Sequence, residues 1–564
     1  MWYTPYLSLV LAGQALAAPL NRRSAPTVSI ENGTVVGYSL LSVESFKGIP
    51  FAQPPVGSLR LKPPQPITES FGTLDATGIP RACPQFYVGF DDSNLPQSAI
   101  AALLNSPLFQ TVSDAGEDCL TVNVQRPEGT TSSSALPVVV WIYGGGFQLG
   151  STQFYDGTSL VSRSASLDQP VIFVAINHRV GGFGFLAGQE LAKDGSTNIG
   201  LRDQRLALEW VQENIAAFGG DPSKVTIWGE SAGSISVFDH TVINCGDHTY
   251  RGQPLFRGAI MDSGAVTPAE PVTGASAQKI YDTVVEAAGC SSATDTLQCL
   301  RDTDYTTFLN AANSVPSILS YRSIDLSYLP RPDPSDNFFS KSPELSILSG
   351  EFAKVPIIIG DQEDEGTLFA ILTANITTTD EMVSYLASYF PTNPNAESVV
   401  AGLVEYYPDD WGISGSPFDT GILWNLYPQF KRLAAILGDV TFTLSRRLYL
   451  AGVSSQVPSW SYLSSYLHGL PILGTLHASD IPYAFGWLGD NVPTVSIQTY
   501  YISFINSLDP NTISTSSPLI KWPQYSTSSP QLLNFQLSSN ALITDDFRQG
   551  AAKYIAANMD QFRV

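Results

Sequence analysis

Runs of β-branched and aromatic residues recur along the chain and predict short buried strands. The clearest runs cover residues 137–143, 170–177, 225–228, 258–262, 355–359 and 460–466. Between the second and third runs, residues 200–219 place Leu206, Trp210 and Ile215 near one face of a helix that ends at a Gly-Gly pair. Strands that alternate with helices predict an α/β fold, with a mostly parallel central sheet and helices on both faces.

Two further segments have compositions that disfavour regular structure. The prolines and glycines of residues 42–66 predict an extended surface path rather than a helix. Residues 512–529 are rich in serine, threonine and proline, which predicts a long surface loop. Because the chain shows no internal repeat and no clear linker, residues 19–564 are predicted to form a single domain.

The first 18 residues have the features of a secretory signal peptide. Residues 7–13 form an apolar core, and small residues at 15–17 suit cleavage, although the start of the segment lacks Lys and Arg. The alternative is an anchoring helix, but the apolar run is too short to cross a bilayer, and no later segment is typical of a transmembrane helix. The Arg22-Arg23 pair fits either a dibasic processing site or two surface arginines.

If the chain is secreted, two Asn-x-Thr sequences can carry glycans and the cysteines can form disulfides. Asn32 and Asn375 are then acceptors for N-linked glycans. None of the five cysteines belongs to a Cys-x-x-Cys or Cys/His cluster, so no metal site is predicted. Cys290 and Cys299 would close a short loop, and Cys245 is expected to be a free, buried thiol.

The remaining two cysteines, Cys83 and Cys119, would close a longer loop that contains an amphipathic segment. In residues 93–105, Ser93 or Asn94 can cap a helix. The apolar residues of this helix fall on one face: Leu95, Ala99, Ile100, Leu103 and Leu104. Such a helix is either a mobile lid or an ordinary helix that packs on the core.

Overall composition narrows the choice of partners. Hydrophobic residues make up 43% of the chain and charged residues only 14%, which suits a large globular core. The net charge of −22 argues against nucleic acids and anionic membrane surfaces as partners, because both would repel the protein.

The strand at 225–228 leads into Gly229-Glu-Ser-Ala-Gly233, which has the Gly-x-Ser-x-Gly pattern of a nucleophile elbow. Glycine on both sides of the serine removes the Cβ atoms that would clash in a sharp strand-to-helix turn. The helix that follows would direct its N-terminal N–H groups at the reacting oxygen. The alternative is a structural turn that happens to be rich in glycine.

A nucleophilic serine needs a base, and the base needs an acid to orient it. In the chain order Ser, acid, His, two histidines lie late enough to serve, His468 and His477, and their positions alone do not decide between them. The acid is expected after the strand at 355–359, since active sites of open α/β sheets lie at the carboxyl ends of strands. The local sequence does not choose among Asp361, Glu363, Asp364 and Glu365.

Several motifs together resemble one family, the type-B carboxylesterases and lipases, which includes cholinesterases and neuroligins. The motifs are Gly229-Glu-Ser-Ala-Gly233, Glu117-Asp-Cys-Leu120, Tyr143-Gly-Gly-Gly-Phe147, Phe46-Lys-Gly-Ile-Pro-Phe-Ala-Gln-Pro-Pro55 and Asp364-Glu-Gly366. Within the family, the segment between Cys83 and Cys119 and the segment 474–480 are most similar to Candida rugosa-like lipases and secreted fungal sterol esterases.

This resemblance implies an α/β-hydrolase fold, a catalytic site and two disulfides. It implies Ser231 as nucleophile, His477 as base and Glu365 as acid. Three backbone N–H groups would form the oxyanion hole, those of Gly145, Gly146 and Ala232. It pairs Cys83 with Cys119 and Cys290 with Cys299, makes 84–118 a lid, and requires no metal or organic cofactor.

The expected function is that of a secreted hydrolase of lipid esters, sterol esters and triacylglycerols, which acts at a water–lipid interface. Open lids could also join two copies of the chain as a homodimer. One alternative is a carboxylesterase for soluble short-chain esters, which the apolar lid segment disfavours. The other is a non-catalytic adhesion module, which the filled triad positions disfavour.

Overall fold

The computed structural model describes residues 25–87, 111–513 and 516–564. The predicted signal peptide, the Arg22-Arg23 pair and the predicted lid helix at 93–105 lie outside the described residues. Only residues 84–87 and 111–118 of the predicted lid excursion are described.

The described chain is built around an eleven-stranded sheet of order β16-β15-β14-β13-β12-β9-β7-β8-β6-β4-β3. Its middle, from β15 to β8, is parallel throughout, and antiparallel pairs occur only toward the two edges. The parallel strands are β7 (Leu136–Ile142), β8 (Ile172–Ile176), β9 (Gly220–Glu230), β12 (Gly258–Asp262), β13 (Ile357–Gln362), β14 (Ser459–Ser464) and β15 (Gln531–Phe535). The predicted α/β fold with a mostly parallel sheet is confirmed.

The outer strands of the sheet and a small separate sheet come mainly from the N-terminal part of the chain. The outer strands are β3 (Tyr38–Leu40), β4 (Val43–Pro50), β6 (Thr121–Pro127) and β16 (Asn540–Thr544). The small sheet pairs β1 (Thr27–Ile30), β2 (Gly33–Val36) and β5 (Gly72–Asp75).

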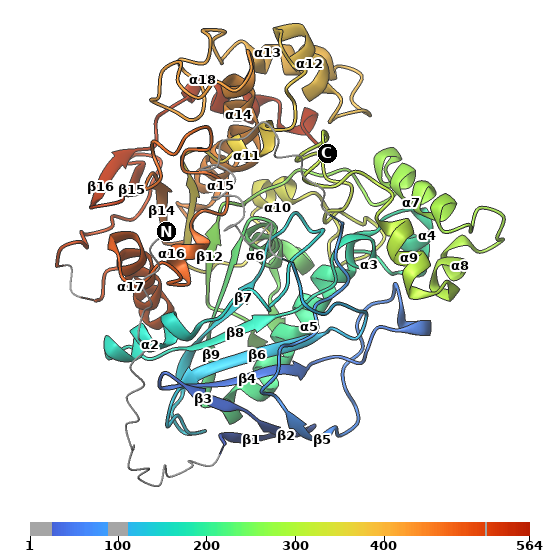
Figure 1. Cartoon of the computed structure of the whole chain (residues 1–564), viewed down its shortest axis with the longest axis vertical. Helices are drawn as coiled ribbons and strands as arrows, with labels where there is room; N and C mark the ends of the chain where they lie inside the picture. The colour runs from blue at the N-terminus through green and yellow to red at the C-terminus, as the bar shows by residue number, and fades with distance from the viewer. Residues whose placement is uncertain (1–24, 88–110, 514–515) are drawn as a thin grey trace, which may run out of the picture.

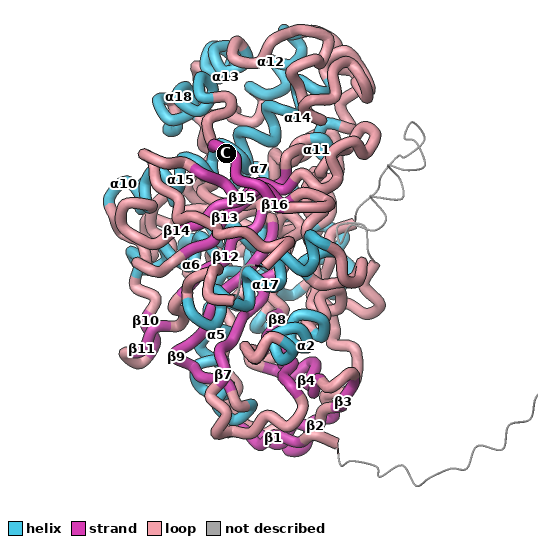
Figure 2. Tube along the Cα trace, turned by 90° about the vertical axis from the view of Figure 1, so that its left-hand side faces the viewer, coloured by secondary structure: helices cyan, strands magenta, loops and turns pink. Residues whose placement is uncertain are grey.

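Helices cover both faces of the large sheet (Figures 1 and 2). On one face, α2 (Thr158–Ser166) and α17 (Val492–Ser507) pack on Val139 and Trp141. On the other face lie α5 (Ile199–Asn214), α6 (Ala232–Val242) and α15 (Leu444–Val453). They share a core with Val138 and Val140, which alternate along β7 with Val139 and Trp141. Both faces of the strands are therefore buried, which explains their continuous apolar runs.

A second group of helices lies beyond the sheet, at the top of Figure 1, and encloses an apolar core of its own. It consists of α11 (Thr367–Ala370), α12 (Thr379–Ala387), α13 (Ala396–Val404), α14 (Phe430–Gly438) and α18 (Gln549–Ala557). The other described helices are α3 (Gly181–Phe185), α4 (Gln189–Asp194), α7 (Ala275–Ala287), α8 (Thr296–Asp302), α9 (Tyr305–Ala312), α10 (Pro343–Ser349) and α16 (Ile481–Ala484).

Two predictions about irregular segments are wrong in part. Within 42–66, β4 is a strand of the large sheet with Phe46 and Ile49 fully buried, so this path is not on the surface. The segment 512–529 has no helix or strand in its described part, but its Trp522 is fully buried and donates a hydrogen bond to the Ser461 carbonyl at 3.0 Å. A large aromatic side chain gains more from burial than a polar loop composition suggests.

The cysteines form the two expected disulfides, and the fifth is free. Cys83 bonds to Cys119 and Cys290 to Cys299. Cys245 is free, but it is exposed rather than buried as predicted. It lies in a surface turn directly after α6, where its backbone adopts a positive φ of 56°.

Candidate active site

Ser231 occupies the sharp turn between β9 and α6, with φ 56° and ψ −126°. The turn is possible only because its flanking residues lack side chains. A Cβ atom on Gly229 would lie 2.4 Å from the Gly233 backbone, and one on Gly233 would lie 2.1 Å from the Ile142 carbonyl oxygen. The sequence pattern therefore produces a strained elbow that projects the serine hydroxyl at the start of a helix.

The structure brings His477 and Glu365 to this hydroxyl. His477 Nε2 lies 2.8 Å from Ser231 Oγ, and His477 Nδ1 lies 2.5 Å from Glu365 Oε2. The other Glu365 oxygen accepts a 2.7 Å hydrogen bond from the Gln362 backbone N–H. All three side chains are at least 95% buried, so the hydrogen-bonded chain is shielded from water.

The second histidine of the sequence analysis, His468, lies elsewhere. Its Nδ1 pairs with Glu363 Oε2 at 3.1 Å, and its side chain is 43% exposed. Burial of Glu363 raises the pKa of that carboxyl to about 7, and the His468 ring acts in the opposite direction. The structure therefore separates the two histidines: one is buried beside Ser231, and the other is on the surface.

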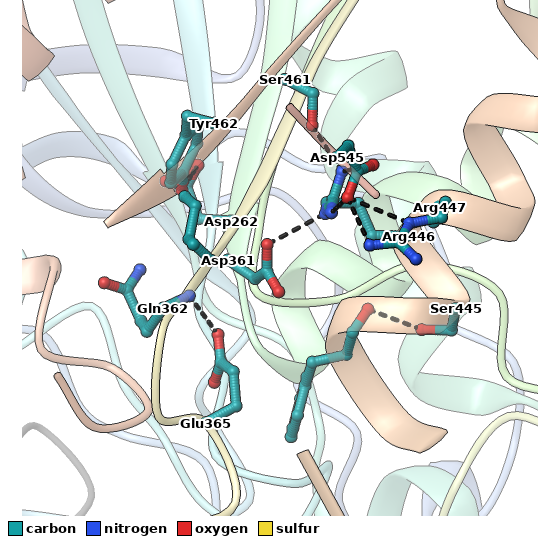
Figure 3. Close-up of polar contacts among 12 residues, drawn as sticks. Asp262, Asp361, Gln362, Glu365, Ser445, Arg446, Arg447, Ser461, Tyr462 and Asp545 are labelled. Atoms are coloured by element: carbon teal, nitrogen blue, oxygen red, sulfur yellow. Dashed lines mark hydrogen bonds and ion pairs between the residues drawn. The ribbon is translucent and has the colours of Figure 1, made fainter. Parts of the chain in front are cut away.

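The remaining two carboxylates of the acidic segment are structural partners. Asp361 lies within β13 and forms an ion pair with Arg446 at 2.9 Å, and Arg446 also pairs with Asp545 (Figure 3). Asp364 accepts hydrogen bonds from Ser416 Oγ and from the Thr475 backbone N–H, at 2.8 and 2.9 Å. Because Thr475 is two residues before His477, Asp364 ties the acid segment to the histidine loop.

A glycine-rich loop after β7 packs directly against the elbow. A Cβ atom on Gly144 would lie 2.5 Å from the Glu230 carbonyl oxygen and 2.8 Å from Ser231 Cβ. Gly145 and Gly146 have φ values of +114° and +61°, which favour glycine. Gly146 lines the same cavity as Ser231 and Ala232, so the loop backbone lies beside the serine.

The start of the predicted lid excursion contacts this glycine loop. The Phe86 backbone N–H donates to the Gln148 carbonyl at 3.0 Å, and the Gly150 N–H donates to Gln85 Oε1 at 2.8 Å. The first described residues of the excursion closed by Cys83 and Cys119 therefore lie next to the site.

Sequence reasoning gave no role to several buried acids that surround the triad positions. Glu230 Oε1 lies 3.4 Å from His477 Nε2. Asp480, three residues after that histidine, is also buried. Burial raises the pKa of both carboxyls well above the usual range, and repulsion adds to it, from Asp480 on Glu230 and from Asp262 on Asp480. Glu230 is part of the Gly-x-Ser-x-Gly motif, but the sequence does not show that its side chain points toward His477, because that depends on the geometry of the elbow.

A third acid of this group, Asp262, is stabilised by three donors. It accepts hydrogen bonds from Trp228 Nε1, Tyr462 OH and Tyr501 OH, at 2.6 to 2.8 Å. Burial still raises its pKa to about 6, although the three donors act to lower it. These contacts join β9, β12, β14 and α17 directly beneath the elbow.

An apolar cavity opens from Ser231 and runs along α6 toward the C-terminal residues. Most of its walls come from aliphatic and aromatic side chains, among them Phe147, Ile235, Ile318, Leu326, Leu403 and Phe562. Phe442 contacts the face of His477, with ring centres 4.5 Å apart. Such a cavity suits a long hydrocarbon chain attached at the serine.

Neither a metal site nor a membrane span is evident in residues 25–87, 111–513 and 516–564. No group of three or more His, Cys, Asp or Glu residues there has an arrangement that could hold a metal ion. Across the same residues, no helix is both long and apolar enough to cross a bilayer.

Comparisons with known proteins agree with this architecture. The carboxylesterase family model matches residues 24–554. Secreted lipase 1 of Botryotinia fuckeliana is 56% identical over 96% of this chain and 95% of its own length. Lipase 5 of Diutina rugosa, also called Candida rugosa, is 45% identical over 98% and 99%. The crystal structure of EstA from Aspergillus niger superposes with a TM-score of 0.78 at 27% identity, over 96% of this chain and 99% of that one.

The chain therefore belongs to the carboxylesterase family, and it is a carboxylic ester hydrolase with the α/β-hydrolase fold. The resemblance drawn from the sequence motifs, including the similarity to Candida rugosa-like lipases, is confirmed.

Proposed function

We propose that this protein is a secreted lipase that hydrolyses water-insoluble carboxylic esters, sterol esters and triacylglycerols among them, through Ser231, His477 and Glu365. The observation that carries this proposal is the continuous hydrogen-bonded chain from the Ser231 hydroxyl through His477 to Glu365. It ends in a buried carboxylate and begins at the mouth of an apolar cavity.

In the first half of the reaction, Ser231 Oγ attacks the ester carbonyl carbon while His477 Nε2 takes the hydroxyl proton. Glu365 holds the other ring nitrogen and stabilises the imidazolium that forms. His477 then gives the proton to the departing alcohol oxygen, the C–O bond of the ester breaks, and the acyl group remains on Ser231.

The negative charge on the carbonyl oxygen needs donors that are fixed in advance. The backbone N–H groups of Gly145, Gly146 and Ala232 are proposed for this role. The positions of these groups support the role. The glycine loop packs against the elbow, and Ala232 is the first residue of α6, where the helix dipole favours negative charge. Loss of one such donor costs about 2.7–4 kcal/mol in other hydrolases.

In the second half, a water molecule replaces the alcohol. His477 removes its proton, the resulting hydroxide attacks the acyl carbon, and the acid product leaves when Ser231 regains its proton. All atoms are supplied by the ester and one water molecule, so these steps need no metal or organic cofactor.

The choice of lipid esters rests on the cavity and on the relatives. The walls of the cavity are mainly hydrocarbon, which favours a long acyl chain over a small polar acid. Two relatives that cover nearly the whole chain are named lipases, and one of them is named as secreted. The excursion from 84 to 118 would act as the lid, and open lids would allow two copies to dimerise.

Secretion of this chain agrees with its disulfides and with the name of its relative. A cleaved signal peptide at 1–18 and glycans at Asn32 and Asn375 are part of the same proposal. Asn375 is exposed, and Asn32 is half-buried in the turn between β1 and β2, so both are on the outside of the fold.

The test compares substrates and one variant. Wild-type protein should hydrolyse emulsified triolein and cholesteryl oleate, and Ser231→Ala should lose both activities while its circular dichroism stays unchanged. Full activity on p-nitrophenyl butyrate with none on either emulsion would favour the soluble-ester carboxylesterase instead. No hydrolysis of any ester by the folded wild-type protein would contradict the proposal as a whole.

A further inference from the structure

One side chain of the acyl cavity does not fit its apolar surroundings. Asp239 is 1% exposed, and neither of its carboxyl oxygens has a hydrogen-bond partner in the described part of the chain. It lines the same cavity as Ser231. Buried carboxyl groups are costly without a partner, so an orphaned one in a ligand cavity points to a partner on the ligand.

The position of Asp239 follows from the helix that begins at the elbow. Ala232, Ile235 and Asp239 are spaced by three and four residues, so they share one face of α6, and all three line the cavity. At 1.5 Å per residue, Asp239 lies about 12 Å along the helix from Ser231. An acyl chain bound at Ser231 and lying along this face would pass Asp239 with its middle carbons.

The chemistry of Asp239 differs from that of the acids beneath the elbow. Repulsion from other carboxylates acts on Glu230 and Asp480, whereas within the described residues burial is the sole influence on Asp239. Burial alone raises the pKa of the Asp239 carboxyl well above its usual range, which keeps the group protonated. A neutral carboxyl has an O–H that donates and a carbonyl oxygen that accepts.

We propose that Asp239 is a specificity-determining residue that binds an oxygen substituent in the middle of a long acyl chain. This inference rests on the proposed function. The favoured substrates are esters of mid-chain hydroxy fatty acids, whose hydroxyl can accept from the Asp239 O–H and donate to its carbonyl oxygen. Mid-chain epoxy and oxo acids can use the donor only. An unsubstituted chain leaves the carboxyl unpaired.

The test measures kcat/KM for p-nitrophenyl esters of stearic, 12-hydroxystearic and 2-hydroxystearic acids and of butyric acid. Wild-type protein should prefer the 12-hydroxy ester over the stearate by about tenfold, the factor that one net hydrogen bond gives. The 2-hydroxy ester should show no such gain. Asp239→Leu, which keeps the branching at Cγ but removes both oxygens, should remove the preference, and Asp239→Asn, which keeps the volume, should retain part of it.

Activity on the butyrate, whose chain is too short to reach Asp239, should be similar in all three proteins and shows that the variants fold. Equal 12-hydroxy preference in wild type and Asp239→Leu would overturn the proposal, as would a preference for the 2-hydroxy ester.

A second measurement is independent of catalysis. Free 12-hydroxystearic acid should displace a fluorescent fatty acid from wild-type protein at lower concentration than stearic acid, and this difference should disappear in Asp239→Leu. Equal displacement by the two acids would overturn the role of Asp239. If no ester is hydrolysed but the displacement difference is found, the proposed function fails and the binding role of Asp239 stands.

Discussion

His477 differs from the other histidines in what surrounds its imidazole ring. His178 and His240 are fully buried, and burial lowers the pKa of each to about 3, which keeps them neutral. His468 is on the surface, paired with Glu363. Only His477, among the five, is hydrogen-bonded to a serine hydroxyl and to a buried carboxylate in the structure.

The first prediction compares the two late histidines. His477→Ala should lower kcat by roughly 10⁴–10⁶-fold, because the base and acid of both half-reactions are lost together. His468→Ala, the matched control, should retain most of the activity, since its ring is on the surface and pairs with Glu363, away from Ser231. Initial rates on p-nitrophenyl butyrate provide the measurement. If the larger loss occurred at His468, our assignment of the base would be wrong.

The choice of the catalytic acid could not be made from the sequence around it. Four carboxylates follow one another within five positions, and nothing local distinguishes them. The structure separates them by tertiary contacts: Asp361 faces Arg446, Asp364 holds the histidine loop, and Glu365 reaches His477. Only the family resemblance could select Glu365 beforehand, because those contacts come from segments about 80 to 110 residues away.

At the scale of elements, the glycine loop and the elbow act as one unit. Gly146 has φ +61°, and a Cβ there would lie 2.4 Å from Ile318 Cδ1. A side chain at Gly146 would therefore strain the loop backbone through its positive φ and press on Ile318, which lines the same cavity as Ser231.

The second prediction follows from this crowding. Gly146→Ala should reduce kcat about 10²-fold or more, the effect of losing one oxyanion donor, with a smaller change in KM. Gly72→Ala is the matched control: Gly72 has φ +70° and open space around it, so the variant carries the strain without touching the site. Steady-state kinetics and melting temperatures of both variants make the comparison. Equal kcat values for Gly146→Ala and wild type would exclude Gly146 from the oxyanion hole.

The third prediction concerns the lid, which stays a sequence-based prediction because its helix lies outside the described residues. Replacing Leu103 and Leu104 with serine should lower turnover of emulsified cholesteryl and long-chain esters, since an open lid exposes its apolar face to lipid. Hydrolysis of a soluble short-chain ester should change much less. Equal losses on both substrate types would favour a helix that simply belongs to the core.

Element boundaries were harder to predict than element types. The strand expected at 355–359 continues to Gln362, because Gly360 to Gln362 pair with residues 462–464 of β14. Asp361 is thus a strand residue, although the sequence analysis placed it after the end of the strand. In β4, a register shift between Phe46 and Ile49 accommodates Gly48 at φ +77°, so a segment rich in turn residues still forms a strand.

At the scale of the whole molecule, a buried ionic network connects the sheet with the C-terminal part of the chain. Arg446 and Arg447 both bind Asp545, at 2.9 and 2.7 Å, and Arg446 also binds Asp361 (Figure 3). The Asp545 carboxyl loses solvation, but the two guanidinium groups outweigh that loss and lower its pKa to about 2.

The fourth prediction is a pH-dependent stability. Since the folded pKa of Asp545 is about 2 and the unfolded value is about 3.9, its contribution is complete above about pH 4 and is lost as the pH falls toward 2. Asp545→Asn should lower the free energy of unfolding by about 3–5 kcal/mol at pH 7, because Arg447 loses its carboxylate partner and Arg446 keeps only Asp361. The difference in the free energy of unfolding between wild type and Asp545→Asn, measured by denaturant titration, should become smaller below pH 4.

Asp409→Asn is the control for this network, because its pair with Arg432 is 3.7 Å long and Asp409 is 53% exposed. Its effect should stay within about 1 kcal/mol. A stability difference between wild type and Asp545→Asn that is the same at pH 7 and pH 3 would contradict the ionic account.

The general fold was predictable because its strands are buried on both faces and therefore carry strong apolar signals, as in β7, β8 and β9. The acyl cavity was not predictable, since its walls come from α6, from helices of the second group such as α13 and α14, from the π-helical turn Asp439–Thr443, and from the C-terminal residues and several loops. Only the folded chain brings these segments together.

The central claim is that Ser231 is the nucleophile, and covalent labelling tests it most directly. Wild-type protein treated with a long-chain p-nitrophenyl alkylphosphonate should gain the mass of one phosphonyl group, and peptide mapping should place that group on Ser231. Ser231→Ala should gain no mass under the same conditions. An adduct on any other residue, or equal labelling of Ser231→Ala, would contradict the account.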